Sequence, residues 1–307
     1  MERVFIAVIN DLVSDQRIGR VADLLMREAY EVRAIGRITS ATPSSHRFPF
    51  RVRRYRMLFR KGPLFYAFYN IRLFFTLLFA PRAALYISND LDTLLAMQIA
   101  ARIRRVPLLY DSHEYFTEVP ELMGRKRVQI FWKRLEAKLL PQVSHRITVS
   151  PSLAELYMQE YGLEFEVVRN VPHSLEGHKE LEKQECMIYQ GALNLGRGIE
   201  LMIDSMQYLD DLQLLLVGAG DIEMELRERV LRLGLEDRVR FMGRMSPAQL
   251  RDLTRTCRLG LSLEEDLGLN YRYALPNKIF DYIQARIPLI CSELPEMEKL
   301  VSGLGVG

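Results

Sequence analysis

The sequence predicts an α/β protein built from two doubly wound parallel-sheet domains. Short, nearly continuous apolar runs alternate with longer segments of helical periodicity along the 307 residues. The alternation stops at a polar, charged stretch, Asn170 to Glu185, and then starts again. Strands that are apolar on both faces are typical of parallel sheets covered by helices, and the length exceeds that of one typical domain.

The first half carries the pattern of one complete parallel sheet. The expected strands are 4–9, 31–35, 84–88, 107–111, 146–149 and 165–168. The expected helices are 15–29, 63–80, 92–104, 127–139 and 152–161. The basic stretch 46–61 lacks either period, and we expect it to be irregular. The apolar run 63–80 is too short and too polar for a membrane span, which favours a core or surface helix.

The second half repeats the alternation. Its expected strands are 187–189, 212–217, 239–242, 260–263 and 289–291, and its expected helices are 198–209, 221–233, 247–257, 277–286 and 295–301. We therefore expect an N-terminal domain over 1–170, a linker over 171–185 and a C-terminal domain over 186–307. The last five residues resemble the entry to a further loop, so we expect the second domain to continue beyond Gly307.

Composition excludes several classes of protein. With 49% hydrophobic and 26% charged residues, and an opening that shows no signal peptide, the chain reads as a cytoplasmic globular protein. Its three cysteines lie far apart, which favours buried thiols over a disulfide framework or a zinc site. Residues 1–170 contain 26 Lys or Arg against 17 Asp or Glu, whereas the remainder contains 16 against 22. The first half is therefore the one expected to face an anionic partner.

The basic stretch 46–61 mixes arginines with aromatic residues directly before the apolar segment 63–80. Three interpretations stand: a solvated face, a nucleic-acid patch, or a surface that meets anionic lipid. No signature of a nucleic-acid-binding module accompanies the stretch, so we expect no nucleic-acid partner. Aromatic and basic residues beside an apolar helix favour a contact of residues 46–80 with an anionic membrane surface.

The segment Leu275 to Tyr282, LPNKIFDY, predicts a nucleotide site. Pro suits the first turn of a helix, and the free N–H groups of that turn suit a phosphate. Asp281 follows Asn277 by one helical turn on the same face, within reach of a ribose. Strands ending in Gly191, Gly218 and Gly243 would bring their turns to the same edge of the sheet.

Other residues of the second half support this edge less strongly. Arg197 opens a helix and could grip a phosphate, although an Arg at that place is often only solvated. Gly218-Ala-Gly220 resembles a dinucleotide fingerprint, but its third glycine is missing, so NAD binding is not expected.

In the first half, polar side chains follow three strands that we expect to be neighbours. His113 and Glu114 follow one strand, Asp90 follows another, and Asp15 and Arg17 follow the first strand of the chain. They would share the sheet edge where ligands bind in such folds. His113 could instead be a satisfied loop histidine, and Asp15 could only cap its helix. Asp90-Leu-Asp92 reads as a helix cap rather than a metal motif, so no metal is expected.

Taken together in their order and spacing, these pieces resemble glycosyltransferase family 4. The fragments are NDLVSDQRIGRVADLL, ISNDLDTLL, LYDSHE, YQGALNLGRGIELMI, LLLVGAG, FMGRM and LPNKIFDY, and they cover the whole chain. The resemblance implies a GT-B fold of two Rossmann-like domains facing a cleft. It also implies a hexosyltransferase-like enzyme that uses a UDP- or GDP-sugar, requires no cofactor and retains the anomeric configuration. Many relatives build cell-surface polysaccharides on lipid carriers, so a glycan or lipid-linked acceptor and a peripheral place at the inner face of the cytoplasmic membrane are implied.

The resemblance also assigns roles by position. His113 matches the histidine that contacts the donor sugar, Arg197 the basic residue at the diphosphate, and Asp281 the acid that grips the ribose. The implied donor-binding set is Gly191, Arg197, Gly218, Gly220, Gly243, Arg244, Asn277, Lys278 and Asp281, and the implied acceptor-side set is Asp15, Arg17, Asp90 and Glu114.

The chain departs from the family pattern at several positions. The last acid is Asp281 rather than Glu, Ala192 stands where an Arg usually follows Gly191, and VSDQR replaces the Gly-Gly loop after the first strand. The first acid of the family's Glu-x7-Glu pattern falls on Tyr273, and its replacements could be Glu264, Glu265 or Asp266. Two other functions therefore remain open: a nucleotide-sugar epimerase of the same fold, and a non-catalytic nucleotide-sugar-binding protein.

Overall fold

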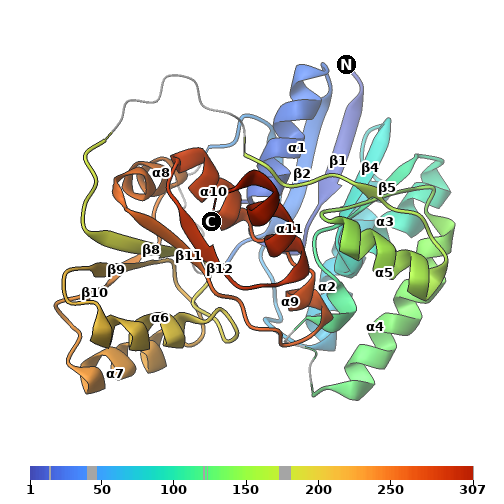
Figure 1. Ribbon diagram of the computed structural model, residues 1–307. Coiled ribbons are helices and arrows are strands. Elements are labelled where there is room, and N and C mark those ends of the chain that lie inside the picture. Colours follow the sequence, from blue (N-terminus) through green and yellow to red (C-terminus); the bar gives the residue numbers. More distant parts are fainter. Residues whose placement is uncertain (14, 40–46, 120–121, 123, 173–180, 307) are drawn as a thin grey trace. The chain divides into compact units, whose positions relative to one another are not determined.

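The computed structural model describes residues 1–13, 15–39, 47–119, 122, 124–172 and 181–306 (Figure 1). The chain forms two compact units, Met1–Arg169 and Asn170–Gly307. Eight residues of the linker expected over 171–185 lie outside the described residues, and the predicted domain limits and cleft stay predictions. Within the described ranges, no helix has the combination of length and apolar character that a membrane span requires.

The first unit is built on a seven-stranded sheet in the order β3-β2-β1-β4-β5-β6-β7, and every pairing is parallel. The strands are β1 (Arg3–Ala7), β2 (Glu31–Arg37), β3 (Arg51–Tyr55), β4 (Leu85–Asn89), β5 (Leu108–Ser112), β6 (His145–Thr148) and β7 (Glu166–Val167). The chain runs outward from β1 to β3 and then restarts at β4 on the other side of β1. The gap between the carboxyl ends of β1 and β4 is therefore the switch point where such sheets hold ligands.

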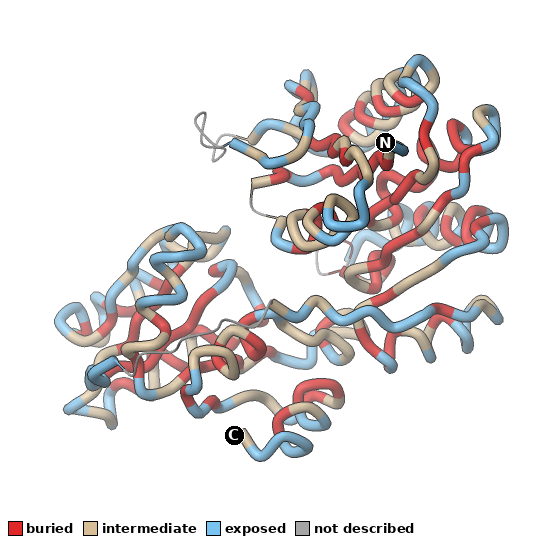
Figure 2. Tube along the Cα trace, turned by 90° about the horizontal axis from the view of Figure 1, so that it is seen from above, coloured by how far each residue is buried: buried red, intermediate tan, exposed pale blue. Residues whose placement is uncertain are grey.

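The helices of the first unit cover its sheet. They are α1 (Gln16–Arg27), α2 (Pro63–Leu78), α3 (Leu91–Arg104), α4 (Lys126–Leu139) and α5 (Pro151–Tyr161), with short 3₁₀ turns at Phe116–Glu118 and Leu140–Gln142. Buried apolar side chains run along the central strands, which appear red in Figure 2. Val4, Ile6 and Ile18 are fully or almost fully inaccessible to solvent and join β1 to α1 in one core cluster.

One strand of the first unit was not predicted. The stretch expected to be irregular contains β3, an edge strand that pairs with β2 so that Arg51 lies opposite Arg33. Three of its five residues are arginines, which hides the alternation of a strand. Only Tyr55 is buried, and its hydroxyl donates to Thr76 on α2 over 2.6 Å. Charged residues are tolerated here because one side of an edge strand faces solvent.

The second unit is built on a five-stranded parallel sheet in the order β10-β9-β8-β11-β12. Its strands are β8 (Cys186–Gln190), β9 (Gln213–Val217), β10 (Val239–Gly243), β11 (Leu259–Ser262) and β12 (Leu289–Cys291). Its helices are α6 (Ile199–Ser205), α7 (Glu223–Leu233), α8 (Pro247–Thr256), α9 (Leu269–Arg272), α10 (Asn277–Ala285) and α11 (Pro295–Leu304), with a 3₁₀ turn at Met206–Tyr208. The short α9 was not predicted.

Two apolar clusters lie on opposite faces of this second sheet. Met187 and Tyr189 of β8 face the cluster that includes α6 and α7, whereas Cys186 and Ile188 face the one that includes α10 and α11. A strand buried on both faces is what a continuous apolar run predicts. The switch point here lies between the carboxyl ends of β8 and β11. Two parallel-sheet units confirm the predicted fold class.

Candidate functional site

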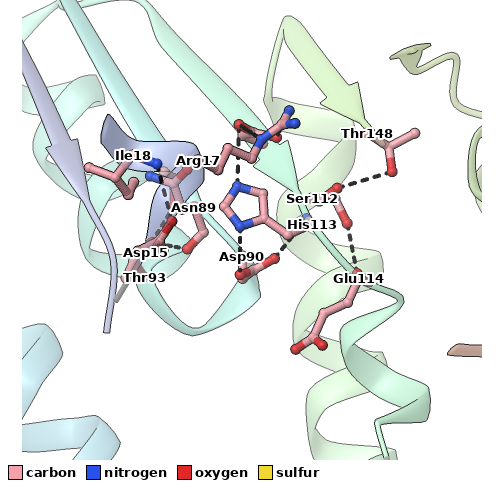
Figure 3. Close-up of polar contacts among 12 residues, drawn as sticks. Asp15, Arg17, Ile18, Asn89, Asp90, Thr93, Ser112, His113, Glu114 and Thr148 are labelled. Atoms are coloured by element: carbon pink, nitrogen blue, oxygen red, sulfur yellow. Dashed lines mark hydrogen bonds and ion pairs between the residues drawn. The ribbon is translucent and has the colours of Figure 1, made fainter. Parts of the chain in front are cut away.

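The switch point of the first unit gathers most of the polar residues predicted there. Asp90 follows β4, Asp111 is the last residue but one of β5, His113 follows that strand, and Arg17 lies in the first turn of α1 (Figure 3). Asn89 links the end of β4 to the end of β1, because its side-chain amide donates to the carbonyl oxygen of Ala7 over 2.9 Å. The side chains therefore come from neighbouring strands, as the parallel alternation predicted.

His113 lies between two carboxylates. Its Nδ1 is 3.5 Å from Asp90 Oδ2, and its Nε2 is 3.3 Å from Asp111 Oδ2. The imidazole is 19% exposed. Asp111 is held in turn by Arg17, whose Nε and Nη2 donate to the two carboxylate oxygens over 2.8 and 2.7 Å. Such a bidentate pair fixes both orientation and charge.

Burial and charge act in opposite directions on the pKa values of this cluster. Burial would lower the pKa of His113, but Asp90 and Asp111 outweigh it and raise that pKa to about 10. Burial would raise the pKa of Asp111, but His113 and Arg17 hold it below its usual value. For Asp90, burial raises the pKa, and His113 opposes the rise. The imidazole is therefore protonated at neutral pH.

Asp15 is the N-cap of α1, because its Oδ1 accepts from the N–H of Ile18 over 3.1 Å. Asp90 occupies the N-cap position of α3 but does not cap it, which corrects the cap expectation; its Oδ1 accepts from the N–H of His113 over 2.9 Å. In Figure 3 the Glu114 carboxylate points away from His113.

In the second unit, the glycines at the strand ends serve close contact between adjacent turns. A Cβ added at Gly218 would lie 1.8 Å from the carbonyl oxygen of Gly191, and one at Gly220 would lie 2.1 Å from that of Leu193. These two glycines are thus required by the backbone itself. Around Gly243 the space is open, and the neighbouring Arg244 is exposed.

A buried carboxylate organises two cations near Gly191. Glu264 is 1% exposed and accepts from Lys278 Nζ over 2.5 Å and from Ser262 Oγ over 2.7 Å. Arg197 Nη1 lies 3.7 Å from the same carboxylate. Burial would raise the pKa of Glu264, but Lys278 outweighs it, so the pKa is lowered and the group is ionised.

Each of the two cations of this cluster also contacts an aromatic ring. Lys278 Nζ lies 4.2 Å from the ring centre of Tyr189, and the guanidinium carbon of Arg197 lies 4.9 Å from that of Tyr271. Both contacts are within the range of cation–π attraction. Arg197 Nε is buried and lacks a hydrogen-bond partner among the described residues. One Lys, one Arg and one carboxylate leave the cluster with a net positive charge.

The acids considered as replacements for a Glu at 273 lie in different surroundings. Glu264 is the buried centre of the cation cluster, whereas Glu265 and Asp266 are exposed. Asp266 forms an ion pair with Arg272 over 3.0 Å. Tyr273 itself is the C-cap of the short helix α9.

Asp281 belongs to a separate chain of hydrogen bonds. Its Oδ2 accepts from the amide of Gln190 over 2.7 Å, and Gln190 Oε1 accepts from Thr254 Oγ1 over 2.9 Å. Asn277 is exposed at the start of α10, whose N-cap is Pro276 and makes no side-chain capping bond. The first turn of α10 therefore directs backbone N–H groups away from its own helix.

Sequence reasoning missed several members of these networks. The roles of Gln190, Thr254, Tyr189 and Tyr271 were not predicted, because they depend on contacts between segments far apart in the chain. The role of Glu264 was one of three alternatives. In the described part of the chain, no group of three or more His, Cys, Asp or Glu side chains is arranged to hold a metal ion.

Two family models match this chain. Residues 14–173 match the model described as a glycosyl transferase 4-like domain, and residues 172–301 match the model described as glycosyl transferases group 1. A comparison with curated proteins gave no match.

Several solved structures share the fold. Sucrose-phosphate synthase from Thermosynechococcus elongatus superposes with a TM-score of 0.76 at 15% identity, over 98% of this chain and 84% of that one. HepE from Anabaena in complex with UDP and glucose gives 0.63 at 16% identity, over 98% and 83%. The lipopolysaccharide outer core galactosyltransferase WaaB gives 0.57 at 14% identity, over 100% and 92%. At these identities the likeness concerns the fold, and it confirms the predicted GT-B architecture.

Proposed function

Because the chain belongs to the glycosyl transferase 4-like family and is a glycosyltransferase, we propose that it transfers a hexose from a UDP- or GDP-sugar with retention of anomeric configuration. HepE of Anabaena is described in complexes with UDP and with UDP-glucose, which supports a nucleotide sugar as donor here. The single observation that carries the proposal is the net positive cluster of Arg197, Lys278 and Glu264 beside Gly191.

Within that cluster the two cations have different tasks. Lys278 is 7% exposed and neutralises Glu264, so its ammonium group is already engaged. Arg197 is 30% exposed, sits farther from the carboxylate and keeps its Nε without a partner among the described residues. Arg197 is therefore the group that we assign to the donor diphosphate. Because Lys278 pairs with Glu264, Arg197 does not form a close ion pair with that carboxylate. Arg suits this task because its fork matches phosphate oxygens.

The leaving diphosphate gains negative charge as the glycosidic bond breaks. Fixed donors aimed at it therefore act more strongly in the transition state than in the ground state. Arg197 and the first-turn N–H groups of α10 supply such donors, and loss of one should cost on the order of 3 kcal/mol in barrier. We propose front-face attack, in which the departing phosphate accepts the proton of the attacking hydroxyl group.

Asp281 is the group that we assign to the donor ribose. It lies one turn inside α10, and Gln190 holds one of its oxygens over 2.7 Å. A carboxylate oriented in this way can accept from ribose hydroxyl groups. Gly218, Gly220, Gly243 and Arg244 remain proposed only as the surroundings of the donor.

We also propose that the first unit meets an anionic membrane and a lipid-linked acceptor used in cell-surface polysaccharide synthesis. A hollow of about 640 Å³ lies between β3 and the end of α2. Arg51 and Arg53 line it together with Phe75 and Phe79, which are 50% and 80% exposed. Exposed rings beside arginines suit the boundary between head groups and acyl chains. His46, the first residue of the predicted surface, lies outside the described residues.

The donor assignment is tested with purified protein. One nucleotide among UDP, GDP and ADP should raise the unfolding temperature. At a concentration of a hundred times its Kd, it should stabilise the folded protein by about 2.7 kcal/mol. Arg197→Ala should then lose about a hundredfold in transfer rate while keeping its circular dichroism spectrum. Arg251→Ala, an exposed residue of α8, is the matched control. Transfer at the parental rate by Arg197→Ala would exclude the assignment, and inversion in the NMR spectrum of the product would exclude retention.

The membrane assignment needs its own measurement. Sedimentation with vesicles should show binding to phosphatidylglycerol-rich vesicles and little to neutral ones, with binding weakened by Phe75→Ser with Phe79→Ser. Tyr208→Ser, an 84% exposed ring on the second unit, is the control. Equal binding to both vesicle types would contradict the proposal.

A further inference from the structure

The imidazole of His113 is bracketed by groups that are held independently of it. On one side, Asp111 is fixed by two hydrogen bonds from Arg17, and Arg17 Nη1 donates to the carbonyl oxygen of Val168 over 2.9 Å. On the other side, Asp90 is held by the backbone N–H of His113. Both ring nitrogens therefore face carboxylates whose positions do not depend on the ring (Figure 3).

The backbone of Asp90 adds a second observation. Its φ of +59° with ψ of 169° lies in a region that is essentially reserved for glycine. The chain nevertheless places an aspartate there, and this side chain does not cap the helix that it precedes. Strain of this kind persists where the surroundings impose it, and here it brings the carboxylate of Asp90 to His113.

We propose that Asp90 is a positioning residue that, together with Asp111, holds His113 as an imidazolium with each ring nitrogen within ion-pair distance of a protein carboxylate. His113 then has no lone pair with which to accept a proton. Resting on the proposed function, this makes His113 a fixed positive charge and not a general base, so the proton of the acceptor hydroxyl group must leave by another route. In this arrangement the departing phosphate accepts that proton.

Charged groups from several elements surround the ring in the described part of the chain. They are Asp15 and Arg17 of the α1 start, Asp90 and Asp92 at the α3 start, Asp111 of β5, and Glu114. Burial raises the pKa of the Asp92 carboxyl well above its usual range. Asp15, Asp90 and Asp111 then face Arg17 and His113. A neutral imidazole would leave the excess negative charge larger, which favours the protonated ring.

The test is a histidine titration by NMR in the full-length protein, with the His113 resonance assigned from its loss in His113→Gln. In the parent, both ring nitrogens should carry protons from pH 6 to pH 8.5. In Asp90→Asn, the imidazole should lose its proton at least tenfold more readily and titrate inside that range. Asp90→Gly, which suits the backbone conformation, should do the same and guards against a folding defect. Asp23→Asn, on α1, should leave the titration unchanged.

Activity supplies a second readout. Because the charged ring would be lost as pH rises, transfer by Asp90→Asn should fall between pH 7 and pH 9, where the parent stays constant. A parental His113 that carries one ring proton at pH 7.5, or an unchanged titration in both Asp90 variants, would overturn the proposal. If the titration behaves as expected but no nucleotide sugar supports transfer, the proposed function fails and the positioning role stands.

Discussion

The buried pair of Lys278 and Glu264 allows a quantitative prediction. Its atoms are 2.5 Å apart, and the side chains are 7% and 0% exposed. Removing one partner of a buried pair leaves an uncompensated charge and costs about 3–5 kcal/mol. In Lys278→Met, Glu264 keeps its hydrogen bond from Ser262 and still has Arg197 Nη1 at 3.7 Å. We therefore expect a loss of stability at the lower end of this range, about 3 kcal/mol. For a unit of this size that corresponds to a fall in Tm of roughly 6–12 °C.

Urea unfolding of three variants measures this effect. Lys278→Met and Glu264→Gln should each destabilise the second unit, and the double variant should recover most of the loss because no unpaired charge remains. The control is Arg227→Met, which breaks an exposed pair with Glu223 on α7 and should cost less than about 1 kcal/mol. The reasoning is refuted if Lys278→Met behaves like this control, or if the two single losses simply add.

Three further outcomes are expected. Gln190→Leu, which removes the donor to Asp281 and the acceptor from buried Thr254, should raise the KM for the nucleotide sugar about tenfold and lower the free energy of unfolding by about 1–3 kcal/mol. The raised pKa of His113 means that its contribution to stability is complete below pH 6.5 and is lost as pH rises through about 10. Urea midpoints of the parent should therefore fall across that window more steeply than those of His113→Gln. Gly218→Ala should fail to fold or lose more than about 2 kcal/mol, because its Cβ would meet a carbonyl oxygen, whereas Gly303→Ala inside α11 should gain about 0.5–1 kcal/mol, both measured by thermal unfolding.

The positions of the functional edges could be predicted from the sequence, whereas the partners of the side chains could not. Alternating apolar runs imply parallel strands, and parallel strands bring their carboxyl ends to one edge, so His113 and Asp90 were expected to be neighbours. The order in which strands pair is not contained in that alternation. Arg17 and Asp111 are 94 residues apart in the sequence. They come into contact because β4 pairs with both β1 and β5, which brings the carboxyl ends of these strands to one edge.

The edge strand β3 and the ion pair of Lys278 were not predicted from the sequence, for related reasons. Three arginines in five residues conceal a strand, because the solvent side of an edge does not require apolar residues. Lys278 was expected to bind the donor, and its burial against a carboxylate was not predicted, since lysine is rarely buried without a partner. Its partner Glu264 comes from the loop after β11, and no periodicity predicts where a loop side chain points.

The two edges solve the same physical problem in the same way. In the first unit, buried Asp111 orients Arg17 and His113; in the second, buried Glu264 orients Lys278 and approaches Arg197. A carboxylate beside two cations lowers the net charge that must be buried. In the second unit it leaves a positive surplus in fixed positions. Groups fixed in advance need not reorganise when charge develops on a leaving group, and that is where electrostatic stabilisation is most effective. If this reasoning is right, replacing either buried acid should reduce transfer more than it reduces nucleotide affinity.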